Sequence, residues 1–126
     1  MFEIQKSAEF SAAHSLRDYD GPCARNHGHN YRVEILVRGD SLDAQGMIID
    51  FEDLDRILAA LIERVDHRNL NEISPFDVEN PTAEVIAAWF YRELEDKVIE
   101  GTRGRGRLAA IRLWETPDAC VTYSKE

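Results

Sequence analysis

The sequence predicts an α+β domain spanning residues 1–126, with a four-stranded antiparallel sheet and two helices on one of its faces. Three observations lead to this prediction. Apolar residues alternate with polar ones near both ends of the chain, as in strands with one buried face. Two central segments instead repeat apolar residues at helical spacing, which gives the element order ββααββ. A chain of 126 residues also suits one hydrophobic core better than two.

Two strands are expected in the first third of the chain. Even positions from Phe2 to His14 form a mostly apolar face in the first strand. Odd positions from His27 to Val37 form such a face in the second strand, which Gly39 ends. The connection between them is rich in turn-forming residues and places Cys23 on a loop.

Two helices are expected in the middle of the chain. Asp50 is typical of an N-cap, and the apolar residues that follow predict a helix to about Val65, with Asp66-His67 at its end or just beyond. Asn80-Pro81 predicts a second N-cap followed by a proline at the first helical position, and Gly101 ends that helix. Residues 108–115 and 119–124 then predict a hairpin.

Composition and charge exclude several classes of protein. Fifteen Lys and Arg residues against 24 Asp and Glu give a net charge of -9, which disfavours binding to nucleic acid or to anionic membranes. The longest apolar run, Val85 to Tyr91, is too short to cross a bilayer, and the first dozen residues carry charges where a signal peptide is apolar. We therefore expect a cytoplasmic protein, with Cys23 and Cys120 as reduced thiols.

Three of the four histidines share the inward phase of the first two strands. His27 and His29 lie two residues apart on one strand face, about 6 to 7 Å between Cα atoms, so both can reach one metal ion. His14 can supply a third imidazole from the neighbouring strand. Three such ligands with one open position are typical of catalytic zinc sites. Ordinary packed histidines are the alternative, but without a metal their unpaired ring nitrogens would cost about 1 to 3 kcal/mol each.

Cys23 lies four residues before His27, and this spacing allows two roles. Its thiolate could replace His14 in the metal set. Beside a metal bound by the three histidines, it could instead act as a general base, because a nearby cation lowers the pKa of a thiol. The spacing leaves both roles open. Cys120, in a short terminal strand, fits a small buried hydrophobic residue and is given no role.

Acidic side chains suggest further parts of a site. Asp66-His67 predicts either a proton relay or a solvated histidine at a helix C-terminus. Glu115 shares the phase of the apolar residues of its strand, so its carboxylate needs a partner in an apolar layer. The paired N–H donors of a pterin or guanine ring would suit it, as would Arg32 or Arg112. The residues alone favour an arginine.

An ordered set of short motifs resembles the 6-pyruvoyltetrahydropterin synthase superfamily over nearly the whole chain. Each motif is weak singly, but their order is specific. The three-residue gap between Cys23 and His27 is similar to that of the superfamily's 6-carboxy-5,6,7,8-tetrahydropterin synthases, which belong to queuosine biosynthesis. The motifs are Phe10-Ser11-Ala12-Ala13-His14, Cys23 to Tyr31, Gly46-Met47 with Asp50-Phe51, Asp66 to Asn71, Asn80 to Glu84 and Trp114-Glu115-Thr116.

The resemblance implies a role for each matching residue. It implies zinc (Zn2+) as the cofactor and a proton relay beside it. It also implies an anchor for the pterin ring and a neighbouring motif near the pterin pocket. The residues concerned are His14, His27 and His29 for zinc, Cys23 as proton acceptor, Asp66 with His67 as relay, Glu115 as anchor and part of the relay, and Thr82 with Glu84 near the pocket.

The resemblance also implies a fold, an assembly and a reaction. The fold is the tunnelling fold, or T-fold, whose subunits join their sheets into barrels, usually as hexamers with active sites between subunits. The reaction converts 7,8-dihydroneopterin triphosphate to 6-carboxy-5,6,7,8-tetrahydropterin, acetaldehyde and triphosphate. Two alternatives are open. One is a 6-pyruvoyltetrahydropterin synthase, which keeps the three-carbon side chain, and the other is a metal-stabilised pterin-binding module without turnover.

Overall fold

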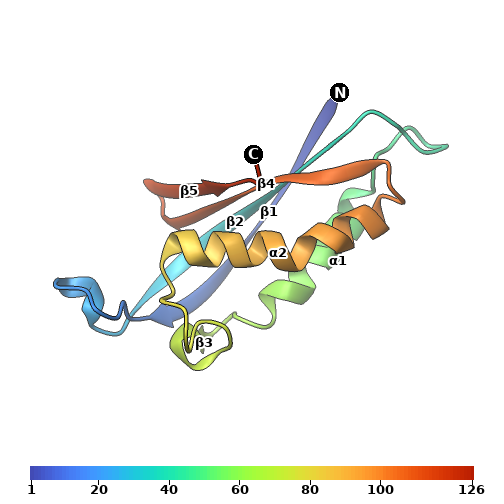
Figure 1. The fold of residues 1–126 in the computed structure, drawn as a ribbon. Helices are drawn as coiled ribbons and strands as arrows, with labels where there is room; N and C mark the ends of the chain where they lie inside the picture. The colour runs from blue at the N-terminus through green and yellow to red at the C-terminus, as the bar shows by residue number, and fades with distance from the viewer.

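A single sheet with both helices on one face forms the architecture of the computed structural model, which describes residues 1–126 (Figure 1). The long strands and the two helices lie where the apolar patterns predict them. Short 3-10 turns cover Pro22–Ala24 and Leu70–Glu72. The other elements are β1 (Phe2–His14), β2 (His27–Gly39), α1 (Phe51–Ile62), β3 (Arg68–Asn69), α2 (Ala83–Gly101), β4 (Gly106–Thr116) and β5 (Ala119–Tyr123).

The sheet has five strands rather than the predicted four, in the order β3-β1-β2-β4-β5. The additional strand, β3, pairs in parallel with Ala12 and Ala13 of β1, whereas all the other pairs are antiparallel. Two residues are too few to show an alternating pattern, which explains why the sequence did not predict this strand.

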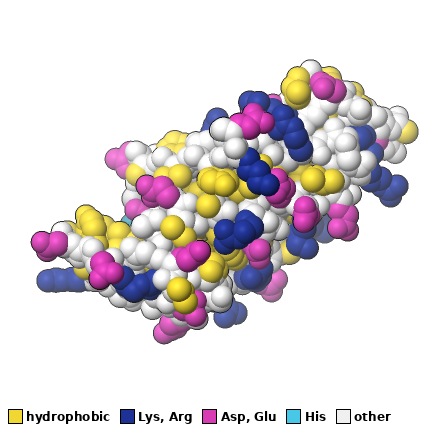
Figure 2. Space-filling view, in the orientation of Figure 1, with side chains coloured by type: hydrophobic (Ala, Val, Ile, Leu, Met, Phe, Trp, Pro, Cys, Tyr) yellow, Lys and Arg dark blue, Asp and Glu magenta, His cyan; other side chains and the backbone are white.

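The two faces of the sheet differ in character. One packs against α1 and α2 around a cluster of 25 buried residues, which includes Phe10, Tyr31 and Ile35. We call the other the helix-free face; it carries Glu9, Asn30, Arg32, Glu34 and Arg112, by the register of β1, β2 and β4. On the face that Figure 2 shows, in the orientation of Figure 1, acidic and basic side chains alternate with small apolar patches. No helix is both long and apolar enough to span a membrane.

The first helix ends three residues earlier than predicted. α1 ends at Ile62, and a turn follows in which the amide of Val65 donates to the carbonyl of Ile62, three residues back, at 2.9 Å. Val65 is still buried, which accounts for the apolar pattern. His67 follows in the left-handed region, with φ of 58°, and this turn brings Arg68 beside β1.

The second helix begins later than predicted. Its N-cap is Thr82, whose hydroxyl accepts a hydrogen bond from the amide of Val85 at 3.2 Å. The prediction of Asn80 as the cap is wrong because the Asn80 side chain instead binds the backbone of Arg17. Gly101 ends α2 as predicted.

Candidate active site

Three histidine side chains converge at the end of the sheet where β1 stops and β2 begins. His14 and His27 lie opposite each other in the register of the two strands, and His29 lies two residues further along the same face. Their donor atoms all lie within 4.8 Å of one another. The Nε2 atoms of His14 and His27 are 3.0 Å apart. The structure thus brings together the three imidazoles that strand phase singled out.

Backbone carbonyls orient two of these rings. The Nδ1 of His14 donates to the carbonyl of Pro81 at 2.8 Å, and the Nδ1 of His27 donates to the carbonyl of Arg25 at 2.7 Å. With protons on Nδ1, the Nε2 atoms of the neutral rings carry lone pairs. Two lone pairs that face each other at 3.0 Å repel unless a cation or a further proton lies between them.

His29 supplies independent evidence for a ligand. Its Nε2 is buried and has no hydrogen-bond partner. An unpaired buried nitrogen costs about 1 to 3 kcal/mol, so natural structures rarely contain one without a reason. A metal ion bound by His14, His27 and His29 would satisfy this atom and the facing lone pairs together. The residues therefore fit a metal ion that favours imidazole ligands.

The charge state of the cluster suits metal binding. Burial lowers the pKa of His14 and of His29 below the ordinary histidine value, although the nearby carboxylate of Glu115 acts in the opposite direction. Both imidazoles are consequently neutral near pH 7. A ligand imidazole must be neutral at the nitrogen that binds the metal.

Glu115 lies at the end of β4 and faces this cluster. Its carboxylate oxygens lie 3.8 Å from the Nε2 of His29 and 3.9 Å from that of His14. The expected pairing with an arginine is wrong: Arg32 and Arg112 approach Glu34 instead, at 3.7 and 3.8 Å. The reason is strand alternation, which puts both arginines on the helix-free face.

The two cysteines are free thiols with different surroundings. Cys23 lies in the 3-10 turn of the β1–β2 connection, and its Sγ is not among the converging donor atoms, so the alternative metal set that included it is not formed. Cys120 is exposed rather than buried as expected, because β5 is an edge strand. Partial desolvation of the sulfur by its neighbours and the nearby carboxylate of Glu34 still raise the pKa of this exposed thiol.

Asp66 and His67 form a pair just beyond α1, beside β1. The Nδ1 of His67 lies 3.0 Å from the Oδ1 of Asp66, which also accepts the amide of Ser11 at 2.9 Å. This hydrogen bond from Ser11 and the contact with His67 lower the pKa of Asp66. The carboxylate is therefore ionised and holds the imidazole in one orientation.

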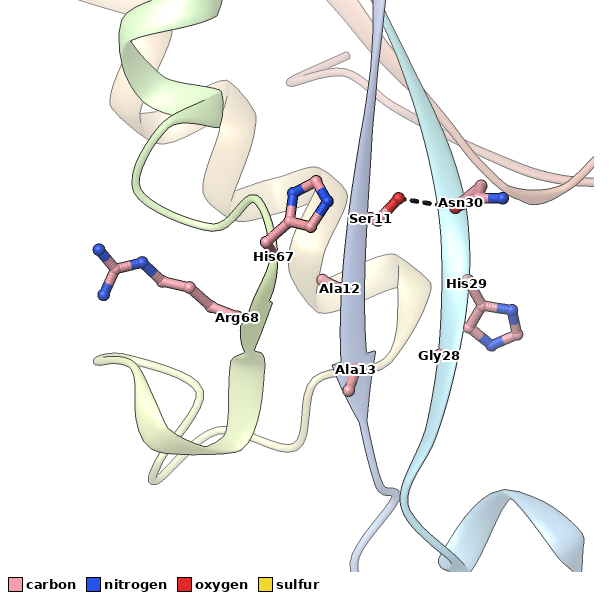
Figure 3. Close-up of a pocket in the computed structure, with 8 residues that line it drawn as sticks. All are labelled: Ser11, Ala12, Ala13, Gly28, His29, Asn30, His67 and Arg68. Atoms are coloured by element: carbon pink, nitrogen blue, oxygen red, sulfur yellow. Dashed lines mark hydrogen bonds between the residues drawn. The ribbon is translucent and has the colours of Figure 1, made fainter.

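The relay pair and the histidine cluster of one chain approach the β1–β2 pair from opposite sides. Figure 3 shows His67 on the β3 side of β1, whereas His29 projects from the far side of β2. His67 is 80% exposed and lines an open cavity of about 400 Å³, which Ser11, Asn30 and His29 of the cluster also line. No hydrogen bond or ion pair joins His67 or Asp66 to the cluster.

Thr82 and Glu84 lie at the N-terminus of α2. Thr82 caps the helix, and Glu84 is exposed in its first turn. The carbonyl of Pro81, next in the chain to Thr82, contacts His14, so this helix end adjoins the cluster. Neither side chain makes a hydrogen bond to the three histidines.

Sequence reasoning gave no role to Tyr31. Its side chain is fully buried, and its hydroxyl oxygen lies 3.3 Å from the Nδ1 of His14. Burial and the nearby Glu115 raise its pKa, so it remains a neutral phenol that packs against the cluster. Tyr31 lies on the same face of β2 as His27 and His29, and this alternation in the sequence could have indicated that it lies beside the cluster. No sequence signal marks the carbonyls of Arg25 and Pro81.

Comparisons with known proteins agree with the fold described above. The family model for 6-pyruvoyl tetrahydropterin synthase matches residues 3–126. A protein of Synechocystis named 6-carboxy-5,6,7,8-tetrahydropterin synthase is 34% identical, over 98% of this chain and 93% of its own length. One of Pyrococcus furiosus named dihydroneopterin monophosphate aldolase is 32% identical, over 86% and 84%.

A solved structure gives the same fold. The 6-pyruvoyl tetrahydropterin synthase of Caenorhabditis elegans superposes with a TM-score of 0.85 at 27% identity, over 99% of this chain and 96% of its own. The fold is therefore the T-fold, as the resemblance implied. Because the family model covers nearly all of the sequence, the chain belongs to the 6-pyruvoyl tetrahydropterin synthase family.

Proposed function

We propose that this protein is a zinc-dependent lyase of queuosine biosynthesis, located in the cytoplasm. It converts 7,8-dihydroneopterin triphosphate and one water to 6-carboxy-5,6,7,8-tetrahydropterin, acetaldehyde and triphosphate. The observation that carries the proposal is the convergence of His14, His27 and His29 with the carboxylate of Glu115 beside them. The name of the Synechocystis relative supports the choice of product.

In this proposal the three imidazoles hold zinc. When bound, zinc polarises the side-chain oxygens of the substrate and so acidifies the neighbouring C–H bonds. The carbonyls of Pro81 and Arg25 hold the Nδ1 protons of His14 and His27, which keeps both Nε2 atoms available as ligands. Zinc is proposed because imidazole nitrogens suit it and three protein ligands leave a position for the substrate.

Glu115 would anchor the pterin ring. A carboxylate accepts the two parallel N–H bonds of an amino-pyrimidinone edge. Because its oxygens lie 3.8 and 3.9 Å from two of the imidazole nitrogens, a ring held there would place its side chain at the cluster. Thr82 and Glu84, at the adjoining end of α2, would contribute to the same pterin pocket.

Cys23, Asp66 and His67 would move the protons. The thiolate of Cys23 would accept a proton from a side-chain carbon of the substrate. Asp66 holds the Nδ1 proton of His67, which leaves the Nε2 of that ring free to take up or return a proton. Together these groups supply the base and the acid that an enolising side chain requires.

A homo-oligomer, proposed to be a hexamer, would complete each site. Within one chain the relay pair and the cluster approach from opposite sides of the β1–β2 pair and share no hydrogen bond or ion pair, which supports a site built between subunits, with His67 serving a neighbour. The edges of the sheet are also available for pairing. β5 is the last strand, and β3 covers only Ala12 and Ala13 of β1.

Product analysis tests the proposal. Zinc-loaded protein incubated with 7,8-dihydroneopterin triphosphate should release acetaldehyde and the 6-carboxy product, identified by mass spectrometry. A 6-pyruvoyl product would favour the other synthase, which the likeness to the C. elegans structure supports as a second candidate. Preference for the monophosphate substrate would favour the activity for which the P. furiosus relative is named.

A substitution of Cys23 separates an enzyme from a binding module. We expect Cys23→Ala to abolish turnover while zinc content and oligomer size stay as in the wild type. Cys120→Ser is the matched control, since this exposed thiol has no role in the mechanism. A wild-type protein that binds zinc and pterin but converts no pterin would instead be a binding module.

A further inference from the structure

We propose that Asn71 and Asn80 are positioning residues of this site, which fix residues 15–17 and, through them, His14 and Cys23. The proposal builds on the metal site and on the role of Cys23 proposed above. Both asparagines lie in motifs to which the mechanism assigns no asparagine. Each makes paired hydrogen bonds to the chain that leaves β1, 56 residues away in sequence for Asn71 and 63 for Asn80.

The two side chains act as a substitute for a neighbouring strand. β1 ends at His14, and the backbone beyond it has no strand partner. Asn71 accepts the amide of Ser15 at 2.8 Å and donates to its carbonyl at 3.0 Å. Asn80 accepts the amide of Arg17 at 2.8 Å and donates to its carbonyl at 3.2 Å. A carboxamide offers an acceptor and a donor side by side, as a peptide group does.

The residue between these two contacts reaches Cys23. The amide of Leu16 donates to the carbonyl of Cys23 at 2.8 Å. Ser15 and Arg17 flank Leu16 in the chain, so the asparagines bind the residues on both sides of this amide. The asparagines on Ser15 and Arg17 therefore set the direction of the Leu16 amide, and this amide fixes the main chain that carries the proposed base.

Asn80 also acts on the metal ligand. It directly precedes Pro81, whose carbonyl accepts the Nδ1 proton of His14 at 2.8 Å. Asn80 and Pro81 thus bind both the backbone of Arg17, just beyond His14, and the imidazole ring of His14 itself. Release of Arg17 from Asn80 would let Pro81 move, and the Nε2 lone pair of His14 would lose its fixed direction.

Zinc affinity and thiol reactivity test this role without any turnover. Asn71→Ala and Asn80→Ala are made in a Cys120→Ser background, so that Cys23 is the only thiol. Zinc affinity is measured by competition with a chromogenic chelator, and Cys23 by its rate of alkylation with iodoacetamide at fixed pH. We expect Asn80→Ala to weaken zinc binding about 10- to 100-fold. Both variants should change the alkylation rate at least about threefold.

Asp43→Ala is the matched control. Asp43 also makes two side-chain bonds to backbone, from the amides of Gln45 at 2.9 Å and Met47 at 3.0 Å. It follows the end of β2 at which Gly39 pairs with Phe2, roughly 40 Å along the strands from the histidines. This variant should lose stability but keep wild-type zinc affinity and alkylation rate.

Asn80→Asp gives a second, isosteric test in case an alanine variant does not fold. It keeps the acceptor for Arg17 but replaces the donor with an oxygen that faces the Arg17 carbonyl, so we expect weaker zinc binding here too. Folded variants with wild-type affinity and alkylation rate would overturn the proposal. So would a wild-type protein that binds no zinc, or equal zinc loss in Asp43→Ala. Zinc binding without pterin turnover would remove only the proposed function.

Discussion

The Nε2 atoms of His14 and His27 lie 3.0 Å apart while backbone carbonyls hold the Nδ1 proton of each ring. Without a cation or a further proton between them, two lone pairs would face each other, and the buried Nε2 of His29 would lack a partner. Each of these arrangements would cost free energy in the folded protein without a bound metal. A bound cation removes all of them together, so metal binding and folding should be strongly linked in this protein.

The first prediction is that zinc raises the melting temperature. Zinc at 100 times its dissociation constant should add about 2.7 kcal/mol to the free energy of unfolding, which is several degrees in Tm. Chelation should reverse the gain. His29→Ala should remove most of it, whereas His67→Ala should keep it, because His67 is exposed and outside the cluster. Equal zinc responses in the two variants would contradict the assigned ligand set.

The second prediction concerns the pH dependence of the metal-free protein. The folded-state pKa values of His14 and His29 are lowered by burial, so the unfolded chain binds protons at these residues more readily than the folded chain. The free energy of unfolding should be constant above the ordinary histidine pKa of about 6.5 and fall as the pH drops below it. Urea midpoints at pH 7.5, 6.0 and 5.0 measure this.

A double variant is the control for this pH effect. His14→Gln combined with His29→Gln removes both titrating groups, so its urea midpoint should fall less between pH 7.5 and 5.0 than that of the wild type. Carboxylates titrate near pH 4, so they contribute little to the change in the urea midpoint between pH 7.5 and 5.0. A wild-type midpoint that does not change with pH would show that both imidazoles titrate normally.

The third prediction concerns the relay pair. The Oδ1 of Asp66 receives both the Ser11 amide and the His67 ring, so Asp66→Asn should disturb the orientation and tautomer of that ring. We expect kcat to fall about 100-fold or more, with zinc content unchanged. Asp53→Asn on the exposed face of α1 is the control and should keep full activity. Full activity in Asp66→Asn would show that the reaction does not need Asp66 to orient His67, which would contradict the proposed relay.

Much of the fold was predictable because its long strands carry the alternating pattern over many residues. The 13-residue strands β1 and β2 fix which side chains share a face, and the histidine cluster follows from that phase alone. Because side chains alternate along a strand, Arg112 and Glu115 lie on opposite faces of β4, so the sequence itself could have excluded an ion pair between them.

Other features depend on contacts between distant segments. Asn80 has the composition of a helix cap, but its side chain binds Arg17, 63 residues away, and Thr82 takes the cap. β3 forms because the turn after α1 brings Arg68 beside Ala12, and two residues carry no period of their own. Local sequence patterns do not reveal contacts between residues that are far apart in the chain. Such a contact, from the Ser11 amide to Asp66, also fixes the position of Asp66 and His67.

The last prediction concerns Glu115, which has no arginine partner and lies beside two imidazoles. Glu115→Gln keeps the shape but replaces one acceptor with an NH2 group, which would face an N–H of the pterin. A lost hydrogen bond to a charged group is worth about 1.5 to 3 kcal/mol, so KM should rise about 10- to 150-fold in zinc-loaded protein. Glu9→Gln on the helix-free face is the control. An unchanged KM in Glu115→Gln would mean that another group anchors the ring, whatever the metal content.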